Sequence, residues 1–120
     1  MKAWLLLYAA ASLVHFVHNA EFLDDYPNMP AWISSAMVYG TWAAQTALGV
    51  AGYLLYRSGH VRFGLGLLAV YAAYGLDGLA HYVLAPLAQH TAAMNATIWL
   101  EVAAATVLLV SVLGVARGRV

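Results

Sequence analysis

Apolar residues form four long runs along the chain, separated by short polar links. The runs cover residues 3–23, 31–56, 61–85 and 92–116. Each run is near the roughly 20 residues that a helix needs to cross a lipid bilayer. The pattern therefore predicts an all-α chain with four transmembrane helices.

The links contain residues that end helices: Pro27 and Pro30, then Gly59, then Pro86. Short links join helices that are antiparallel neighbours. We therefore expect a single membrane domain, residues 1–120, folded as an antiparallel four-helix bundle. Small residues on the second run indicate close helix packing. They are Gly40, Ala43, Ala47 and Ala51, with Gly49 and Gly52 beside them.

The composition supports a membrane protein, because 64% of the residues are hydrophobic and only 8% are charged. A soluble domain carries about 25% charged residues. The formal net charge is zero, so no basic surface for nucleic acid is expected. The absence of cysteine excludes disulfides and thiolate metal sites. The opening "MKAWLLLYAAASLV" also fits a signal peptide, but we interpret it as the first membrane helix.

Charge fixes an expected orientation. When the chain is threaded through four spans, all basic residues fall on one side: Lys2, Arg57, Arg62, Arg117 and Arg119. Basic loops are normally cytoplasmic, so both termini are expected inside a cell (inner) membrane. All acidic residues fall in the opposite half: Glu21, Asp24, Asp25, Asp77 and Glu101. The half of the bundle that carries the acidic side chains is therefore expected to face the periplasm or the exterior.

Ionisable side chains from three of the apolar runs are expected at the same depth in the bilayer. At about 1.5 Å of rise per residue, His15, Asp77 and Glu101 should lie at a similar level. His15, His18 and Glu21 follow in steps of three, and Asp77 and His81 are four apart, which suggests shared helix faces. Asp24 and Asp25 are expected on the solvated rim, and His90 in an interfacial loop.

On the fourth run, His90, Met94, Thr97 and Glu101 are spaced so that they lie along one face of the helix.

A lone charge at bilayer depth costs at least about 2.5–3.5 kcal/mol. No Lys or Arg lies at this depth, so a histidinium, a metal cation or protons must neutralise the acids.

The first hypothesis for this layer is a metal centre. Imidazole and carboxylate ligands suit Zn, Fe, Mn or Cu, and bundle cores often hold such sites. The candidate ligands are His15, His18, Glu21, Asp77, His81 and Glu101. With a metal at this site, the protein could be a metalloenzyme that acts on a lipophilic substrate.

The second hypothesis needs no metal. A buried acid and a histidine, drawn from Glu101, Asp77 and His81, would form a catalytic acid–base pair. The substrate would be an isoprenoid or sterol-like lipid from the bilayer.

The third hypothesis is a non-catalytic membrane subunit or metal-delivery factor. A haem held by His15 and His81 is disfavoured by the nearby carboxylates. An apolar outer surface would also suit a homodimer.

The stretch "HNAEFLDDYPNMPAW" resembles the signature of small integral membrane proteins with a His-x-x-Glu-Glu motif. His18 and Glu21 match the motif in type and spacing, whereas Phe22 stands where the second Glu would be. In that family the motif also ends a first apolar helix and precedes a proline-containing link. The family has no established activity, so the resemblance implies only a membrane site near this motif.

Overall fold

The computed structural model describes residues 1–118, and Arg119 of the predicted basic side lies outside them. It is all-helical, and the described residues contain no strand. The long helices are α1 (Lys2–Glu21), α2 (Ser35–Arg57), α3 (Val61–Tyr74) and α5 (Ala92–Ala116). The shorter elements are η1 (Leu23–Asp25), η2 (Asp77–Ala80), α4 (His81–Leu84) and η3 (Leu87–Gln89). The predicted all-α class is confirmed.

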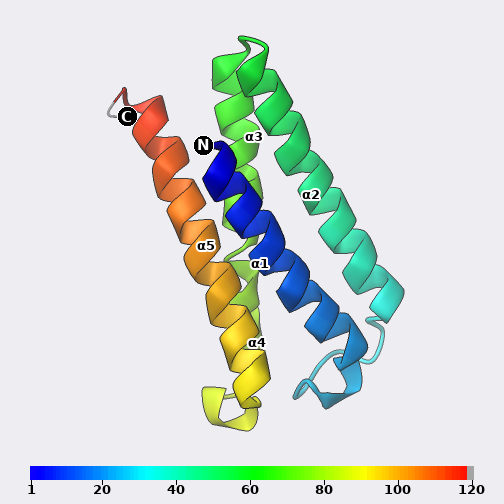
Figure 1. Cartoon of the computed structure of the whole chain (residues 1–120). Coiled ribbons are helices and arrows are strands. Elements are labelled where there is room, and N and C mark those ends of the chain that lie inside the picture. Colours follow the sequence, from blue (N-terminus) through cyan, green and yellow to red (C-terminus); the bar gives the residue numbers. More distant parts are fainter. Residues whose placement is uncertain (119–120) are drawn as a thin grey trace.

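The helices form a four-membered antiparallel bundle (Figure 1). α1 packs between α2 and α5, and α3 closes the ring by contacting both α2 and α5. Because successive helices run in opposite directions, the two termini lie at one end of the bundle, called here the termini end (Figure 1). The links of residues 22–34 and 85–91 lie at the other end, called the acidic end (Figure 1).

Three helical segments are long and apolar enough to cross a membrane: Lys2–Glu21, Val61–Leu84 and Ala92–Ala116. α2 has 23 residues, but its glycines, threonines and Gln45 make it less apolar than the other three segments. Three of the four predicted spans are therefore confirmed as helical segments long and apolar enough to cross a membrane, and a fourth span by α2 stays a prediction.

The third apolar run is interrupted, unlike the continuous helix that we expected over 61–85. α3 ends at Tyr74, and the chain continues as the 3₁₀ segment η2 before one further turn, α4. Gly75 lies at the break, where the ring of Tyr8 packs directly against its backbone. A Cβ at Gly75 would lie 2.6 Å from Tyr8 Cε2, so only glycine permits this approach.

The hydrophobic core occupies the half of the bundle near the termini end. It is built from Leu5, Tyr8, Ala11, Leu65, Leu68, Tyr71, Ala72, Ala104, Ala105, Leu108 and Val112. The expected stripe on α2 does not form its contact with α3, because Gly40, Ala43 and Ala47 are exposed. Gly49 and Gly52 lie in that contact instead.

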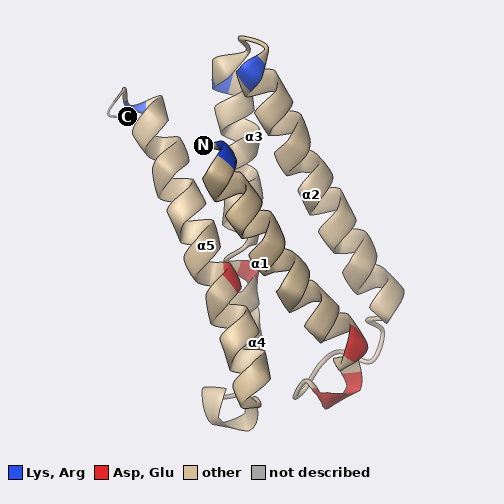
Figure 2. Cartoon of the chain, in the orientation of Figure 1, with Lys and Arg blue, Asp and Glu red and all other residues tan. Residues whose placement is uncertain are grey.

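Charged residues separate along the bundle axis (Figure 2). Lys2, Arg57, Arg62 and Arg117 lie at or near the termini end, and every Asp and Glu lies in the half towards the acidic end (Figure 2). The structure thus places basic and acidic groups on opposite halves, as the sequence predicted for a threaded bundle.

Gly64 offers a test of the close contact between α2 and α3. A Cβ at Gly64 would lie 2.7 Å from Tyr56 Cα and 2.8 Å from the Gly52 carbonyl oxygen. We expect Gly64→Ala to lower the free energy of unfolding by about 1–3 kcal/mol through overpacking. The control is Gly66→Ala on the same helix, because its Cβ would meet nothing within 4 Å. Equal thermal unfolding midpoints in detergent for the two variants would contradict this contact.

Candidate functional site

A pocket of about 360 Å³ opens on the side of the bundle towards the acidic end. α1 and α2 form one wall, η2 and α4 form the facing wall, and Glu101 reaches the pocket from α5. Most of the lining is apolar, and it includes Phe16, Met29, Pro30, Trp32, Ile33, Met37, Val38, Ala80 and Leu84. The polar lining residues are His15, Asn19, Thr41, Gln45, Asp77, His81 and Glu101.

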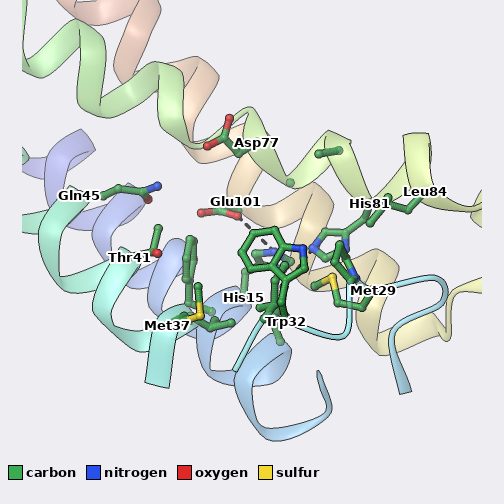
Figure 3. A pocket seen from close by; sticks show the side chains of 17 residues that line it. His15, Met29, Trp32, Met37, Thr41, Gln45, Asp77, His81, Leu84 and Glu101 are labelled. Atoms are coloured by element: carbon green, nitrogen blue, oxygen red, sulfur yellow. Dashed lines mark hydrogen bonds and ion pairs between the residues drawn. The ribbon is translucent and has the colours of Figure 1, made fainter. Parts of the chain in front are cut away.

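Four of the six candidate site residues predicted from the sequence therefore line one pocket: His15, Asp77, His81 and Glu101 (Figure 3). They come from α1, η2, α4 and α5. His18 and Glu21 do not line it. His18 is half-buried and Glu21 is exposed, so both lie away from the pocket on the outer part of α1.

Glu101 is the most deeply buried acid of the described chain, with 1% of its surface exposed. Its Oε2 lies 3.7 Å from His15 Nε2, and the imidazole is itself 3% exposed (Figure 3). Its Oε1 is buried and has no hydrogen-bond partner among the described residues. Since no Lys or Arg occurs between residues 63 and 116, His15 is the group that can balance this carboxylate.

Hydrogen bonds on the far side of the imidazole assign its tautomer. The Thr97 hydroxyl donates to the Met94 carbonyl oxygen at 3.1 Å, so its oxygen accepts from His15 Nδ1 at 3.3 Å. A neutral His15 then carries its proton on Nδ1, and its Nε2 lone pair faces Glu101. A single proton can therefore rest either on the carboxyl of Glu101 or on Nε2 of His15.

His81 extends this polar group towards the acidic end. Its Nε2 accepts a hydrogen bond from Asn19 Nδ2 at 3.0 Å, and its ring centroid lies 5.4 Å from that of His15. His90 packs behind it at 6.2 Å between ring centroids. His90 Nδ1 donates to the Pro86 carbonyl oxygen at 3.0 Å, which fixes the imidazole in the link before α5.

The two outer candidates have partners of their own. His18 Nδ1 and the Tyr26 hydroxyl are 2.9 Å apart. The Tyr39 hydroxyl donates to Glu21 Oε1 at 2.5 Å, which ties the end of α1 to α2. Glu21 is thus a surface residue with a structural partner, and His18 contacts Tyr26, whose ring lies 4.8 Å from the His81 ring between centroids.

A metal centre built from these six residues stays a prediction. Within residues 1–118, no group of three or more His, Asp or Glu side chains comes together in a way that could hold a metal ion. His15 and Glu101 are close enough to share a ligand, but His81 Nε2 is engaged by Asn19. The geometry describes an acid–imidazole pair more directly than a coordination sphere.

The sequence interpretation missed Asn19, Tyr26 and the buried position of His90. A step of three residues turns an α-helix about 60° short of a full revolution, so two steps from His15 reach about 120° away. Asn19, four residues from His15, stays on the buried face. The buried polar positions Tyr8, Ser12, His15 and Asn19 are spaced by four, three and four residues, and this spacing would have identified Asn19 in advance.

Comparisons with known proteins return no match. No protein-family model, no curated protein and no solved structure matches the chain. The resemblance to the His-x-x-Glu-Glu proteins therefore stays a prediction.

Tyr26 gives a pH-dependent test of the outer part of the site. It lies in the link after η1, and burial raises the pKa of its hydroxyl from about 10 to about 12. Between pH 10 and 12 the unfolded chain loses a proton that folded Tyr26 keeps, so stability falls as the pH rises. We expect Tyr26→Phe to lack this share of the alkaline loss. Between pH 9 and 12 the unfolding midpoint of the wild type should fall further than that of Tyr26→Phe, and parallel curves would contradict the burial.

Proposed function

We propose that this protein binds a lipophilic molecule within the membrane and transfers protons to and from it with the Glu101–His15 pair. One observation carries the proposal. A carboxyl that is 1% exposed, with no Lys or Arg in the surrounding helix segments, presents an unpartnered oxygen beside a mostly apolar pocket and has an imidazole as its neighbour. A buried acid without a hydrogen-bond partner, in a pocket where a few polar groups converge, is typical of a catalytic site.

The shape of the pocket favours a lipid-like ligand. A volume of about 360 Å³ is within the range of small-molecule sites, which runs from about 300 to 1,000 Å³. Its edges are exposed residues of α2 and α4, among them Met37 and Leu84. In a bilayer these edges would face acyl chains, so an isoprenoid or sterol-like molecule would reach Glu101 without crossing water.

The acid–base step balances without a cofactor. The Glu101 carboxyl proton adds to one carbon of an alkene, and the π electrons form the new C–H bond. The neighbouring carbon becomes cationic, with the carboxylates of Glu101 and Asp77 on the same pocket to stabilise it. Loss of a proton from the next carbon to the Glu101 carboxylate completes a double-bond shift.

Four polar lining residues then have roles. Glu101 donates and recovers the proton, and His15 accepts a proton whenever the carboxyl must ionise. His81, held by Asn19, orients the polar end of the pocket. A metal centre and a non-catalytic subunit role remain the alternatives that the sequence raised.

For the orientation, we propose that α2 is the fourth span and that the termini end is cytoplasmic. The basic residues gather at that end, which is the side that the positive-inside rule assigns to the cytoplasm (Figure 2). The pocket then lies in the periplasmic or exterior half of a multi-pass protein of the cell (inner) membrane.

Deuterium uptake tests the chemistry directly. Purified protein in D₂O is incubated with farnesol as an isoprenoid probe and cholesterol as a sterol probe. We expect carbon-bound deuterium in one of them, because each proton added to an alkene comes from exchanged Glu101. Glu101→Gln should slow this uptake by a factor on the order of 10²–10⁴. Mass spectrometry of the recovered lipid measures it.

The matched control is Asp24→Asn, which removes an exposed acid of η1 outside this pocket. It should keep the wild-type rate. Uptake at the wild-type rate by Glu101→Gln would contradict the role of this residue. Elemental analysis of the same preparation separates the alternative: about one equivalent of metal, lost in a His15→Ala, His81→Ala double variant, would favour a metal centre.

Cysteine labelling tests the orientation, because the chain has no cysteine of its own. Ala88→Cys places a thiol in the exposed link before α5, and Ser58→Cys places one in the exposed turn after α2. A membrane-impermeant maleimide should label the first variant in intact cells, and the second only after the membrane is opened. The reverse pattern would contradict the proposed topology, because it is expected of an inverted bundle and also of a chain in which α2 does not span. Labelling of both would show that the segment Val61–Leu84 does not separate the two positions.

A further inference from the structure

We propose that two grooves beside the first turns of α3 hold one anionic phospholipid, with its phosphate at Arg62 and one acyl chain on each side of the helix. The site lies at the termini end and shares no residue with the Glu101 pocket, so it does not rest on the proposed chemistry. Two of its walls belong to the segments Val61–Leu84 and Ala92–Ala116, which are long and apolar enough to cross a membrane.

The first groove lies between the end of α2 and the start of α3, and its volume is about 390 Å³. Its lining residues are Leu55, His60, Arg62, Phe63, Gly66 and Leu67. His60 precedes α3 and Arg62 lies in its first turn, whereas Leu67 lies further along the helix. The groove is therefore polar at the termini end and apolar beyond it, which suits a lipid with its headgroup at that end.

The second groove lies between α3 and the last turns of α5, and its volume is about 430 Å³. Ala69 lines it from α3, and Val112 and Leu113 line it from α5. Arg62 is the only charged residue in its lining. Since Arg62 and Gly66 line both grooves, α3 forms a ridge between them.

Gly66 makes this ridge low just beyond Arg62. It lies four residues after Arg62, on nearly the same face of the helix. It is exposed, and a Cβ there would meet nothing within 4 Å. The two acyl chains of a phospholipid leave one glycerol unit, so they can pass on both sides of a helix only where no side chain stands between them. Arg62 thus holds the phosphate, and Gly66 lets the chains separate.

The charge of this region selects an anionic headgroup. The Arg62 guanidinium can bond two phosphate oxygens at once. No Asp or Glu lies in this half of the bundle to compete for it (Figure 2). The ammonium group of a zwitterionic lipid offsets the attraction of its phosphate, whereas an anionic lipid keeps a net negative charge. Basic pockets between membrane helices are known to bind anionic lipids from the cytoplasmic side, which is the side proposed for the termini end.

Native mass spectrometry of the full-length protein in detergent tests the site. The protein is titrated with palmitoyl-oleoyl phosphatidylglycerol and, separately, with the phosphatidylcholine that carries the same chains. We expect one phosphatidylglycerol per chain, bound at least about 5-fold more tightly than phosphatidylcholine, which corresponds to about 1 kcal/mol for one basic residue near an anionic lipid.

Arg62→Gln should weaken the binding of phosphatidylglycerol by about 5-fold and so remove the preference. The matched control is Arg57→Gln, because Arg57 is exposed at the end of α2 beside the same turn and lines neither groove. It should change the affinity by less than about twofold, since salt screens an exposed charge outside the grooves. An equal loss in the two variants would overturn the site, because it would show only a loose accumulation of anionic lipid at the basic end.

Gly66→Leu fills the space between the two acyl chains. Because the added Cβ has no close neighbour, the unfolding midpoint in detergent should stay at the wild-type value. The binding of phosphatidylglycerol should weaken by at least about tenfold, the contribution of about two methylene groups of an acyl chain. Wild-type affinity in this variant would contradict the grooves.

Lysophosphatidylglycerol repeats this test on the unaltered protein, because it has the same headgroup and only one chain. It should bind at least about tenfold more weakly than the diacyl lipid. Equal binding of the two lipids, or displacement of the diacyl lipid by millimolar inorganic phosphate, would overturn the proposal by revealing an anion site without chain contacts. Deuterium uptake by the lipid probes should be unchanged in Arg62→Gln, so failure of this site and failure of the Glu101 chemistry are separate results.

Discussion

The site depends on how a bundle without basic residues in its polar half accommodates a buried carboxyl. Glu101 lies deep between α5, α1 and η2, where an isolated charge would cost at least about 2.5–3.5 kcal/mol. His15 is the partner that reduces this cost, and Thr97 orients it by occupying Nδ1. The register of α1 against α5 is therefore tied to a chemical requirement as well as to apolar packing. The same placement brings His81 against the His15 ring, and Asn19 donates a hydrogen bond to His81.

The break in the third apolar run explains why His81 is buried whereas Asp77, four residues earlier, is exposed. In a continuous α-helix, residues four apart differ by about 40°, so Asp77 and His81 would share a face. In a 3₁₀ segment with three residues per turn, four steps amount to about 120°. η2 thus lets His81 point inward, at 8% exposure, while Asp77 remains exposed at the pocket wall. The close approach of Tyr8 to Gly75 positions the break.

Much of this architecture could be predicted from the sequence, because long apolar runs and helix-ending residues are strong local signals. The run expected over 92–116 is α5 itself, Ala92–Ala116. The arrangement of side chains was harder to predict. Asn19 carries no charge, so the pattern of ionisable residues does not include it. His90 lies four residues after Pro86 and is predicted in an interfacial loop, yet its side chain is buried against His81. Such positions depend on tertiary contacts between distant segments, which spacing along one helix does not reveal.

The hydrophobic core and the pocket share no residue, because the core lies towards the termini end and the pocket towards the acidic end. Folding stability and the ligand contacts proposed for the pocket thereby fall on different positions of a chain of 120 residues. Substitutions at Trp32, Met37 or Leu84 would change the width of the pocket without removing a core contact. A scaffold divided in this way can acquire a new ligand preference through few mutations, each with a small effect on folding.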